Sequence, residues 1–320
     1  MSEQFKIQSQ KSKITYIFPG QGSQVVGMGK DLCSNFKQAR EVFEEADEAL
    51  EFKLSEMCFA GTAEDLALTA NTQPAILTTS IAAFRAMEAE GFQKPDFVAG
   101  HSLGEYSALV AADAVSFSDA VKTVRKRGIY MQEAVPVGVG AMAAILGLPL
   151  KKVEIACEEA KQEQICSPAN INSPSQIVIA GNAEAIDRAC ELLKERGAKR
   201  AIRLNVSAPF HCGLMMPAQK KLAEDLQKIN FQDLKFPVIE NVSAKANTKG
   251  ERVRVALTKQ VSKPVHWAQS VENLIVEGVE IFVEVGAGKI LSGLVRQINR
   301  EVRCFNVENS DSLKNTLLSF

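Results

Sequence analysis

Several features that mark other classes of protein are scarce or missing in this chain of 320 residues. The formal net charge is only −1, so no overall electric field attracts nucleic acid or an anionic membrane. The uncharged stretch at residues 134–150 is interrupted by prolines and glycines and is too short to span a bilayer. Residues 1–13 are polar, and we therefore expect neither a signal peptide nor a membrane anchor there.

Cysteine and histidine are also used sparingly. The seven cysteines are scattered and include no Cys-x-x-Cys pair, which argues against a disulfide framework and against a zinc site. This usage is typical of reduced thiols in a reducing compartment. We therefore expect a cytoplasmic protein, or a stromal one in a plant or alga, that binds no metal. Three histidines are available for acid–base chemistry.

What the chain does contain is an alternation of predicted strands and helices. A strand at 14–18 is followed by helical spacing of apolar residues at 43–50 and 76–87. A second strand at 97–99 precedes a helix at 118–133. Alternation of this kind predicts an α/β fold with a mostly parallel sheet that is covered on both faces.

The middle of the chain has a different order of elements. Its pattern predicts the β-α-β-β-α-β order of the ferredoxin-like unit, with elements at 141–146, 150–162, 169–171, 176–180, 183–196 and 200–206. We interpret 138–206 as a small ferredoxin-like domain inserted into a large α/β domain made of 1–137 and 207–320. A strand predicted at 280–285 belongs to the second part of the large domain.

The segment Gly100-His-Ser-Leu-Gly104 is the most informative motif, because it has the Gly-x-Ser-x-Gly spacing of a nucleophile elbow. The two glycines permit a sharp turn from strand to helix that exposes the hydroxyl of Ser102. The same turn directs the backbone N–H of Leu103 to the position where an oxyanion forms. An ordinary Gly/Ser turn is the alternative. The predicted strand before the motif and the helix after it favour a catalytic serine.

A serine hydroxyl is a poor nucleophile until a base removes its proton. His101 adjoins the serine, and neighbouring side chains at such a turn point apart, which favours a structural role. His266 is flanked by apolar groups and is typical of a packed histidine. His211 lies where the small domain returns to the large one, and pockets form at domain interfaces, so we expect His211 to be the base. No aspartate stands out as its partner, since Asp225 and Asp233 are expected at the surface.

The segment Pro19-Gly-Gln-Gly-Ser-Gln24 follows the first predicted strand and therefore lies at the same sheet edge as the elbow. No Gly-Lys-Ser/Thr follows it, and its glycine spacing does not match the dinucleotide-binding fingerprint. We therefore expect this loop to supply a second oxyanion N–H, from Gln21, rather than to bind a phosphate.

Arg127 is the remaining candidate site residue. On the helix predicted at 118–133 it borders the apolar face, whereas Lys122 and Lys126 point away from that face. An unpaired buried guanidinium is costly, so Arg127 requires a carboxylate partner. An internal salt bridge and a substrate carboxylate both meet this requirement, and the residues alone leave both open.

These motifs, in chain order, resemble those of the malonyl-CoA:acyl carrier protein transacylases, the stand-alone malonyl transferases of type II fatty acid synthesis. The resemblance covers nearly the whole chain and rests on residues 18–24, 100–104, 127–132, 170–174, 176–181, 207–211 and 284–289. It implies an α/β-hydrolase-like large domain, an inserted ferredoxin-like small domain and a cleft between them.

The resemblance also implies a role for each candidate residue. It assigns the nucleophile, the base, the two oxyanion N–H donors and the malonate-binding arginine, in that order, to Ser102, His211, Gln21, Leu103 and Arg127. In this family a backbone carbonyl orients the histidine, and that carbonyl is expected at Gln260. A backbone partner would explain why no aspartate stands out in the sequence.

The implied activity is transfer of a malonyl group from malonyl-CoA to the phosphopantetheine thiol of acyl carrier protein, through a malonyl-serine intermediate, in fatty acid biosynthesis. Malonyl-CoA and the carrier are the expected partners, and no cofactor is expected. We expect a monomer that binds neither nucleic acid nor a membrane. A discrete acyltransferase of a polyketide synthase is one alternative, and a serine thioester hydrolase is the other.

Acyl carrier proteins are strongly acidic, so a chain with little net charge must concentrate positive charge locally to attract them. The densest basic segment is 194–200. We expect Lys199 and Arg200 to contact the carrier, because the strand that they begin leads toward His211. The alternative is an ordinary solvated helix end, where cations are favourable.

Overall fold

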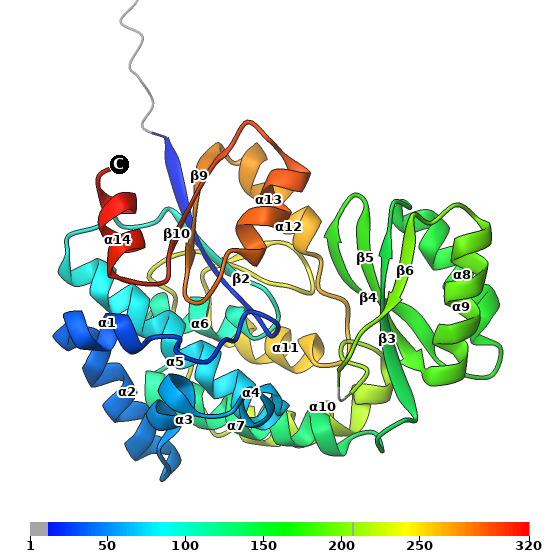
Figure 1. The fold of residues 1–320 in the computed structure, drawn as a ribbon, viewed down its shortest axis with the longest axis horizontal. Coiled ribbons are helices and arrows are strands. Elements are labelled where there is room, and N and C mark those ends of the chain that lie inside the picture. The colour runs from blue at the N-terminus through cyan, green and yellow to red at the C-terminus, as the bar shows by residue number, and fades with distance from the viewer. Residues whose placement is uncertain (1–11, 207, 320) are drawn as a thin grey trace, which may run out of the picture.

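The computed structural model describes residues 12–206 and 208–319 and contains two sheets that lie side by side (Figure 1). Most of the polar segment at 1–13 lies outside the described residues, and so does Ser207, where we expect the large domain to resume. A six-stranded sheet with most of the helices forms one half of the molecule, and a four-stranded sheet forms the other. The predicted α/β class is confirmed.

The six-stranded sheet is mostly parallel, as the alternation of strands and helices predicted. Its strands are β1 (Lys13–Phe18), β2 (Phe97–Gly100), β7 (Val238–Ile239), β8 (Ala246–Asn247), β9 (Val279–Val285) and β10 (Arg303–Val307). They are arranged in the order β10-β9-β1-β2-β7-β8. The pairings from β10 to β7 are parallel, and β7 pairs with β8 antiparallel. Parallel strands end at the same edge of a sheet, so the loops after β1, β2, β7 and β9 lie together.

Helices pack on both faces of this sheet. Ile14, Tyr16 and Phe18 of β1 belong to the core shared with α2, α5, α6 and α7, whereas Ile17 belongs to the core shared with α12 and α13. Two-sided burial of this kind is typical of parallel strands. The helices of this half are α1 (Lys30–Asn35), α2 (Lys37–Leu50), α3 (Leu54–Ala60), α4 (Ala63–Ala67), α5 (Thr69–Ala89), α6 (Gly104–Ala111), α7 (Phe117–Glu133), the 3₁₀ turn Gly213–Met215, α10 (Met216–Leu226), α11 (Gly250–Gln260), α12 (Trp267–Val276), α13 (Ile290–Ile298) and α14 (Ser310–Leu317).

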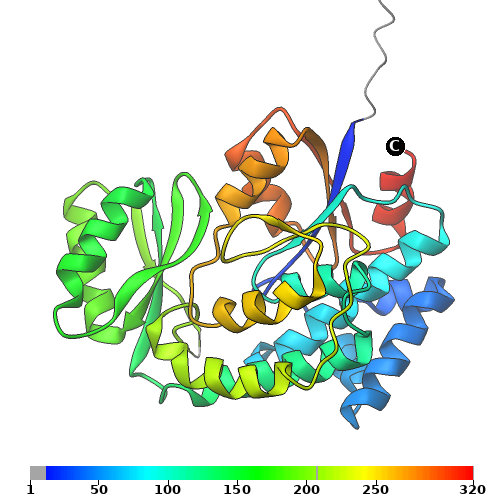
Figure 2. The same ribbon diagram turned by 180° about the vertical axis from the view of Figure 1, so that it is seen from behind.

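The second sheet is antiparallel and has the strand order β4-β5-β3-β6. Its elements are β3 (Gly140–Leu146), α8 (Leu150–Lys161), β4 (Cys166–Ser173), β5 (Gln176–Asn182), α9 (Ala183–Glu195) and β6 (Arg200–Arg203). Two predicted strands differ most in their bounds: β4 is longer than 169–171, and β6 ends at Arg203 rather than at residue 206. Figures 1 and 2 show α8 and α9 on the side of this sheet that faces away from the larger one.

The opposite face of the second sheet packs toward the larger one. Met142 and Val178 on this face share a core with Phe210 and Met215, which lie on either side of His211 in the chain. The edge strand β4 is also tied to the large half, because the N–H of Ile171 donates to the oxygen of Val265 at 2.9 Å. His211 is therefore held where the two sheets meet.

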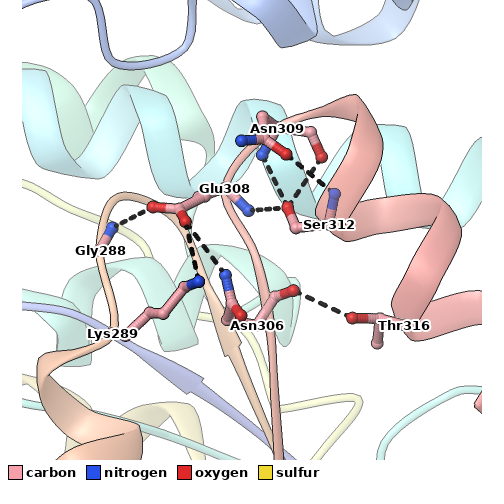
Figure 3. Close-up of polar contacts among 7 residues, drawn as sticks. All are labelled: Gly288, Lys289, Asn306, Glu308, Asn309, Ser312 and Thr316. Atoms are coloured by element: carbon pink, nitrogen blue, oxygen red, sulfur yellow. Dashed lines mark hydrogen bonds and ion pairs between the residues drawn. The ribbon is translucent and has the colours of Figure 1, made fainter.

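The turn between β10 and α14 contacts the loop that follows β9 (Figure 3). Glu308, just after β10, accepts a hydrogen bond from the Gly288 N–H at 3.1 Å, and its carboxylate lies 3.6 Å from Lys289 Nζ. Gly286 in this loop has φ 127°, and a Cβ there would lie 3.2 Å from Pro19 Cγ. The loop therefore packs closely against the glycine-rich segment that follows β1, and glycine is required at this contact.

Within the described ranges, we find no helix that combines the length and the apolar character needed to cross a membrane.

Candidate active site

Ser102 lies at the turn between β2 and α6, and the backbone there explains both glycines of the motif. A Cβ at Gly100 would lie 1.9 Å from the backbone carbon of Gly104, and one at Gly104 would lie 2.0 Å from the backbone oxygen of Phe18. Both positions are closed to any other residue. Ser102 itself has φ 52°, a left-handed conformation that is strained for a residue with a side chain. The turn is therefore a nucleophile elbow in its geometry as well as its sequence.

His211 contacts Ser102 on one side of its ring and a backbone carbonyl on the other. The distance from His211 Nε2 to Ser102 Oγ is 2.7 Å, and that from His211 Nδ1 to the oxygen of Gln260 is also 2.7 Å. A carbonyl oxygen can only accept, so Nδ1 carries the proton. Nε2 of the neutral ring is then the acceptor that faces the serine hydroxyl.

The surroundings of His211 keep its ring neutral. The residue is 3% exposed, and burial together with the nearby positive charge of Arg127 lowers the pKa of His211 to about 3. The hydrogen bond to the Gln260 carbonyl opposes this shift without overcoming it. At neutral pH the ring is therefore able to accept a proton.

Arg127 reaches the same serine from α7. Its Nη2 lies 3.1 Å from Ser102 Oγ, and its side chain is 2% exposed. Nη1 donates to Gln73 Oε1 at 2.7 Å, and Nη2 also donates to Gln260 Oε1 at 2.8 Å. Burial lowers the pKa of Arg127.

The partners of Arg127 bear on the two interpretations that the sequence left open. The side chains that accept from it are two neutral amides and the Ser102 hydroxyl, and no carboxylate of the described residues forms an ion pair with it. Arg127 therefore forms no internal salt bridge with the described residues. The Nε–H of Arg127 is buried and has no acceptor among the same residues, which favours a substrate carboxylate as the missing partner.

Leu103 and Gln21 carry the backbone N–H groups expected to bind the oxyanion. Leu103 precedes α6 with helical φ and ψ, and Gln21 follows Gly20, where a Cβ would lie only 2.3 Å from the backbone oxygen of His101. The glycine-rich loop thus lies directly against the elbow. Within the described chain, neither N–H donates to a backbone or side-chain acceptor, so both are free to donate to a ligand.

Three side chains around Ser102 escaped the sequence analysis. Asn241, in the loop after β7, accepts from the Ser102 N–H at 2.6 Å and donates to the Gly100 oxygen at 2.7 Å. Glu105 is buried in the first turn of α6, where burial raises its pKa to about 7. The third is Gln73, which holds Arg127. Asn241 follows the parallel strand β7 and therefore lies at the same sheet edge as the elbow, which could have indicated its place in the site. The sequence did not predict β7, however, because a strand of two residues has almost no alternating pattern.

A pocket of about 290 Å³ opens between the two halves beside His211. Its walls come from β4, from the start of α8 and from the segments around 213–216 and 262–266. Lys263, Pro264 and His266 also line a neighbouring pocket of about 590 Å³, so the two pockets lie next to each other. The pocket therefore reaches His211, which in turn contacts Ser102.

The other histidines have different positions. His101 is held by Asn172, whose Oδ1 lies 2.8 Å from its Nε2, and its ring packs against Trp267, in agreement with the predicted structural role. The prediction for His266 was incomplete, because this half-buried residue lines both pockets. The prediction for Asp225 was wrong. Asp225 is buried, and it accepts from Tyr130 Oη at 2.7 Å.

The carrier-docking candidates lie farther from the pocket than the sequence suggested. Lys199 and Arg200 are exposed at the start of β6, which is the edge strand opposite β4. Since β4 lines the pocket, β5 and β3 separate these two residues from it within the sheet. The strand that follows them leads toward His211 in sequence, but the basic pair itself is not part of the site.

Residues 15–311 match the profile of a family described as the acyl transferase domain. A malonyl CoA-acyl carrier protein transacylase of Bacillus subtilis (strain 168) is 51% identical over 304 residues, covering 95% of this chain and 96% of that protein. The chain belongs to the malonyl-CoA:acyl carrier protein transacylase family.

Solved structures of this family have the same fold. The transacylase of Coxiella burnetii superposes with a TM-score of 0.94 at 43% identity, covering 96% of this chain and 97% of that one. A malonyl-transacylase in complex with a holo acyl carrier protein of a type II polyketide synthase also has a TM-score of 0.94, at 44% identity, covering 97% and 100%. The resemblance seen in the sequence is confirmed at the level of family and fold.

Proposed function

We propose that this chain transfers a malonyl group from malonyl-CoA to the phosphopantetheine thiol of acyl carrier protein. The observation that carries the proposal is the arrangement around one oxygen atom. Ser102 Oγ lies 2.7 Å from a neutral histidine nitrogen and 3.1 Å from the guanidinium of Arg127. A base for the hydroxyl and a cation for a substrate carboxylate thus meet at the same nucleophile. The activity named for the relatives supports the same reaction.

In the first half-reaction Ser102 Oγ attacks the thioester carbonyl while His211 Nε2 removes the hydroxyl proton. The carbonyl oxygen becomes an oxyanion that accepts hydrogen bonds from the N–H groups of Gln21 and Leu103. The C–S bond then breaks, and the CoA sulfur leaves with the proton that His211 returns. The product is a malonyl ester on Ser102, and the Gln260 carbonyl accepts from Nδ1–H throughout.

The second half-reaction uses the same groups in reverse. His211 removes the proton from the phosphopantetheine thiol of the carrier, and the sulfur attacks the ester carbonyl of the malonyl-serine. The C–O bond breaks, and the Ser102 oxygen recovers the proton from His211. Every group in both steps belongs to this chain or to its two substrates, so the proposal includes no cofactor.

Arg127 distinguishes malonyl from acetyl groups in this proposal. The two acyl groups differ by one carboxylate, and the guanidinium beside Ser102 has a buried nitrogen, Nε, whose N–H has no acceptor in the described chain. A hydrogen-bonded carboxylate in a site with little water contributes far more to selectivity than an apolar group of similar size.

The fold supports a finer description. We infer that the six-stranded half is α/β-hydrolase-like and that 138–206 is an inserted ferredoxin-like domain, because β3 to β6 have the order expected of that unit. The pocket between the halves is then an interdomain cleft, and we propose that a single chain is sufficient for the reaction.

A second function has specific support. One relative is solved with a carrier protein of a type II polyketide synthase, so the carrier of this chain belongs either to fatty acid or to polyketide synthesis. The steps at Ser102 are the same in both cases. Transfer rates measured with purified carriers of each kind distinguish them.

The test of the proposed function is mass spectrometry of the intact protein after incubation with malonyl-CoA. We expect one malonyl adduct on Ser102, its discharge by holo carrier protein, and a fall of several orders of magnitude in transfer by Ser102→Ala. Malonyl transfer that survives Ser102→Ala contradicts the proposal. Rapid release of free malonate without a carrier would instead identify a thioester hydrolase.

A further inference from the structure

A buried carboxylate behind the nucleophile has no part in the reaction described above. Glu105 is 2% exposed and lies in the first turn of α6, three residues after Ser102. Its Oε2 accepts from Gln260 Nε2 at 2.8 Å and from the N–H of Asn241 at 3.1 Å. A backbone N–H can only donate, so this oxygen is an acceptor in the folded protein.

The contact with Glu105 determines which way the Gln260 side chain faces. Gln260 Nε2 donates to Glu105 Oε2 and also to the backbone oxygen of Ser102, at 2.8 Å each. Both partners accept, so the NH₂ end of the amide must face them. The Oε1 end is then left to accept from Arg127 Nη2. Without an acceptor at residue 105, the amide loses part of what prevents a flip, and a flipped NH₂ group would face the guanidinium donor to donor.

The second donor to Glu105 holds the other side of the elbow. Asn241 accepts from the Ser102 N–H, while Gln260 donates to the Ser102 oxygen. Glu105 thus anchors two residues that bind the two backbone groups of Ser102. The φ of 52° at Ser102 is unfavourable for serine, so this conformation depends on contacts of this kind.

We propose that Glu105 is a positioning residue that, through Gln260 and Asn241, holds Arg127 and the Ser102 backbone in the orientation needed for malonyl transfer. The inference rests on the proposed function, because selectivity for the malonyl carboxylate is its readout. Glu105 touches no reacting atom. It orients the amide of Gln260, which binds Arg127, and it binds Gln260 and Asn241, which hold the backbone of the strained Ser102.

The test compares two substitutions of similar size. Glu105→Met removes the acceptor and keeps the volume, and an apolar group is tolerated at a buried site of this shape. Glu105→Gln keeps one carbonyl oxygen that can occupy the position of Oε2. The measurements are the rates of Ser102 loading from malonyl-CoA and from acetyl-CoA, followed by intact-protein mass spectrometry, and the thermal midpoint of each variant.

We expect Glu105→Met to lower malonyl loading by about 10- to 100-fold, the range of one hydrogen bond to a charged group, and to lower acetyl loading less. The malonyl-to-acetyl ratio therefore falls, whereas loss of folded protein alone lowers both rates equally. Glu105→Gln retains most of the wild-type ratio. A folded Glu105→Met protein with the wild-type ratio overturns the proposal.

A second variant keeps the test decisive if Glu105→Met does not fold. Gln260→Leu removes the side-chain link to Arg127 but keeps the backbone oxygen that holds His211. We expect it to lower the malonyl-to-acetyl ratio, and an unchanged ratio overturns the proposal. Where Glu105→Met does fold, combining it with Gln260→Leu should lower the ratio little beyond either change alone.

The two proposals fail in different ways. Absence of a malonyl adduct on Ser102 in the unaltered protein refutes the proposed function. A normal adduct in the unaltered protein, with the same malonyl-to-acetyl ratio in Glu105→Met and Gln260→Leu, refutes the role of Glu105 alone.

Discussion

His211 Nδ1 lies 2.7 Å from the backbone oxygen of Gln260, at the C-terminal end of α11, and this carbonyl lies where a catalytic triad has a carboxylate. A carbonyl fixes the tautomer and the ring orientation as an aspartate does. It carries no net charge, however, and so it stabilises the protonated ring less. Burial and the charge of Arg127 lower the pKa of His211, and no carboxylate bound to the ring opposes them.

The first prediction concerns the pH dependence of malonyl loading. With a pKa near 3 instead of the ordinary 6.5, His211 stays unprotonated as the pH falls from 8 to about 5. We therefore expect no loss of the loading rate around pH 6.5 from protonation of the base. Rapid-quench loading of Ser102 between pH 5 and 8 measures this.

A control is needed because Glu105, two hydrogen bonds from Arg127, has a pKa near 7. The same profile recorded with Glu105→Gln removes that titration. An acid limb near pH 6.5 that persists in Glu105→Gln would show that His211 titrates near its ordinary value.

The second prediction concerns selectivity. Arg127→Ala removes the cation beside Ser102, and we expect malonyl loading to fall about 100-fold or more while acceptance of acetyl-CoA rises relative to malonyl-CoA. The measured quantity is the ratio of kcat/KM for the two thioesters.

Lys122→Ala is the matched control for Arg127→Ala. It removes one positive charge from the exposed face of the same helix and should leave the ratio unchanged. An unchanged ratio in Arg127→Ala would assign this arginine to the support of the elbow rather than to the substrate.

Much of this site follows from short-range sequence rules. The elbow needs glycine at two fixed positions, and a parallel sheet brings the ends of β1 and β2 to one edge, so Ser102, Leu103 and Gln21 could be placed together from the chain alone. His211 could be selected because few histidines compete with it and because it lies at a boundary between two patterns of elements.

The contacts that hold Arg127 could not be predicted in the same way. Gln73 and Gln260 come from two helices far apart in the chain, and nothing in their local sequence shows that they face one guanidinium. The sequence pattern placed Arg127 beside an apolar face and left its partner open. The distance of Lys199 from the pocket also escaped prediction, because the order of strands in an antiparallel sheet differs from their order in the chain.

The third prediction concerns the elbow glycines. A Cβ at Gly104 would lie 2.0 Å from the backbone oxygen of Phe18, and neither backbone can move without separating β1 from the elbow. We expect Gly104→Ala to lower the free energy of unfolding by roughly 2–4 kcal/mol or to prevent folding. Urea denaturation measures the change.

Gly293 provides the matched comparison. It lies inside α13, and a Cβ there would meet no atom within 4 Å. Gly293→Ala should therefore raise the free energy of unfolding, by up to about 1 kcal/mol, because alanine favours a helix. Equal effects of the two substitutions would contradict the close packing at the elbow.

The last prediction concerns the surface that binds the carrier. We propose that Lys199 and Arg200, both exposed at the start of β6, attract the acidic carrier. Three strand spacings, about 14 Å in all, separate β6 from the β4 strand that lines the pocket. Reversing both charges should therefore affect the carrier without disturbing Ser102. We expect Lys199→Glu with Arg200→Glu to raise the KM for carrier about tenfold, to weaken its salt dependence, and to leave malonyl-CoA loading nearly unchanged.

The control reverses two exposed lysines of the large half, Lys30 and Lys122, and so changes the net charge by the same amount. If the effect is local, this control leaves the KM for carrier close to the wild-type value. If both double variants raise it equally, the carrier responds to net charge and not to the β6 edge. If Lys199→Glu with Arg200→Glu leaves the KM unchanged, the carrier docks elsewhere, and the basic residues around the pocket, with Lys263 first among them, become the next positions to reverse.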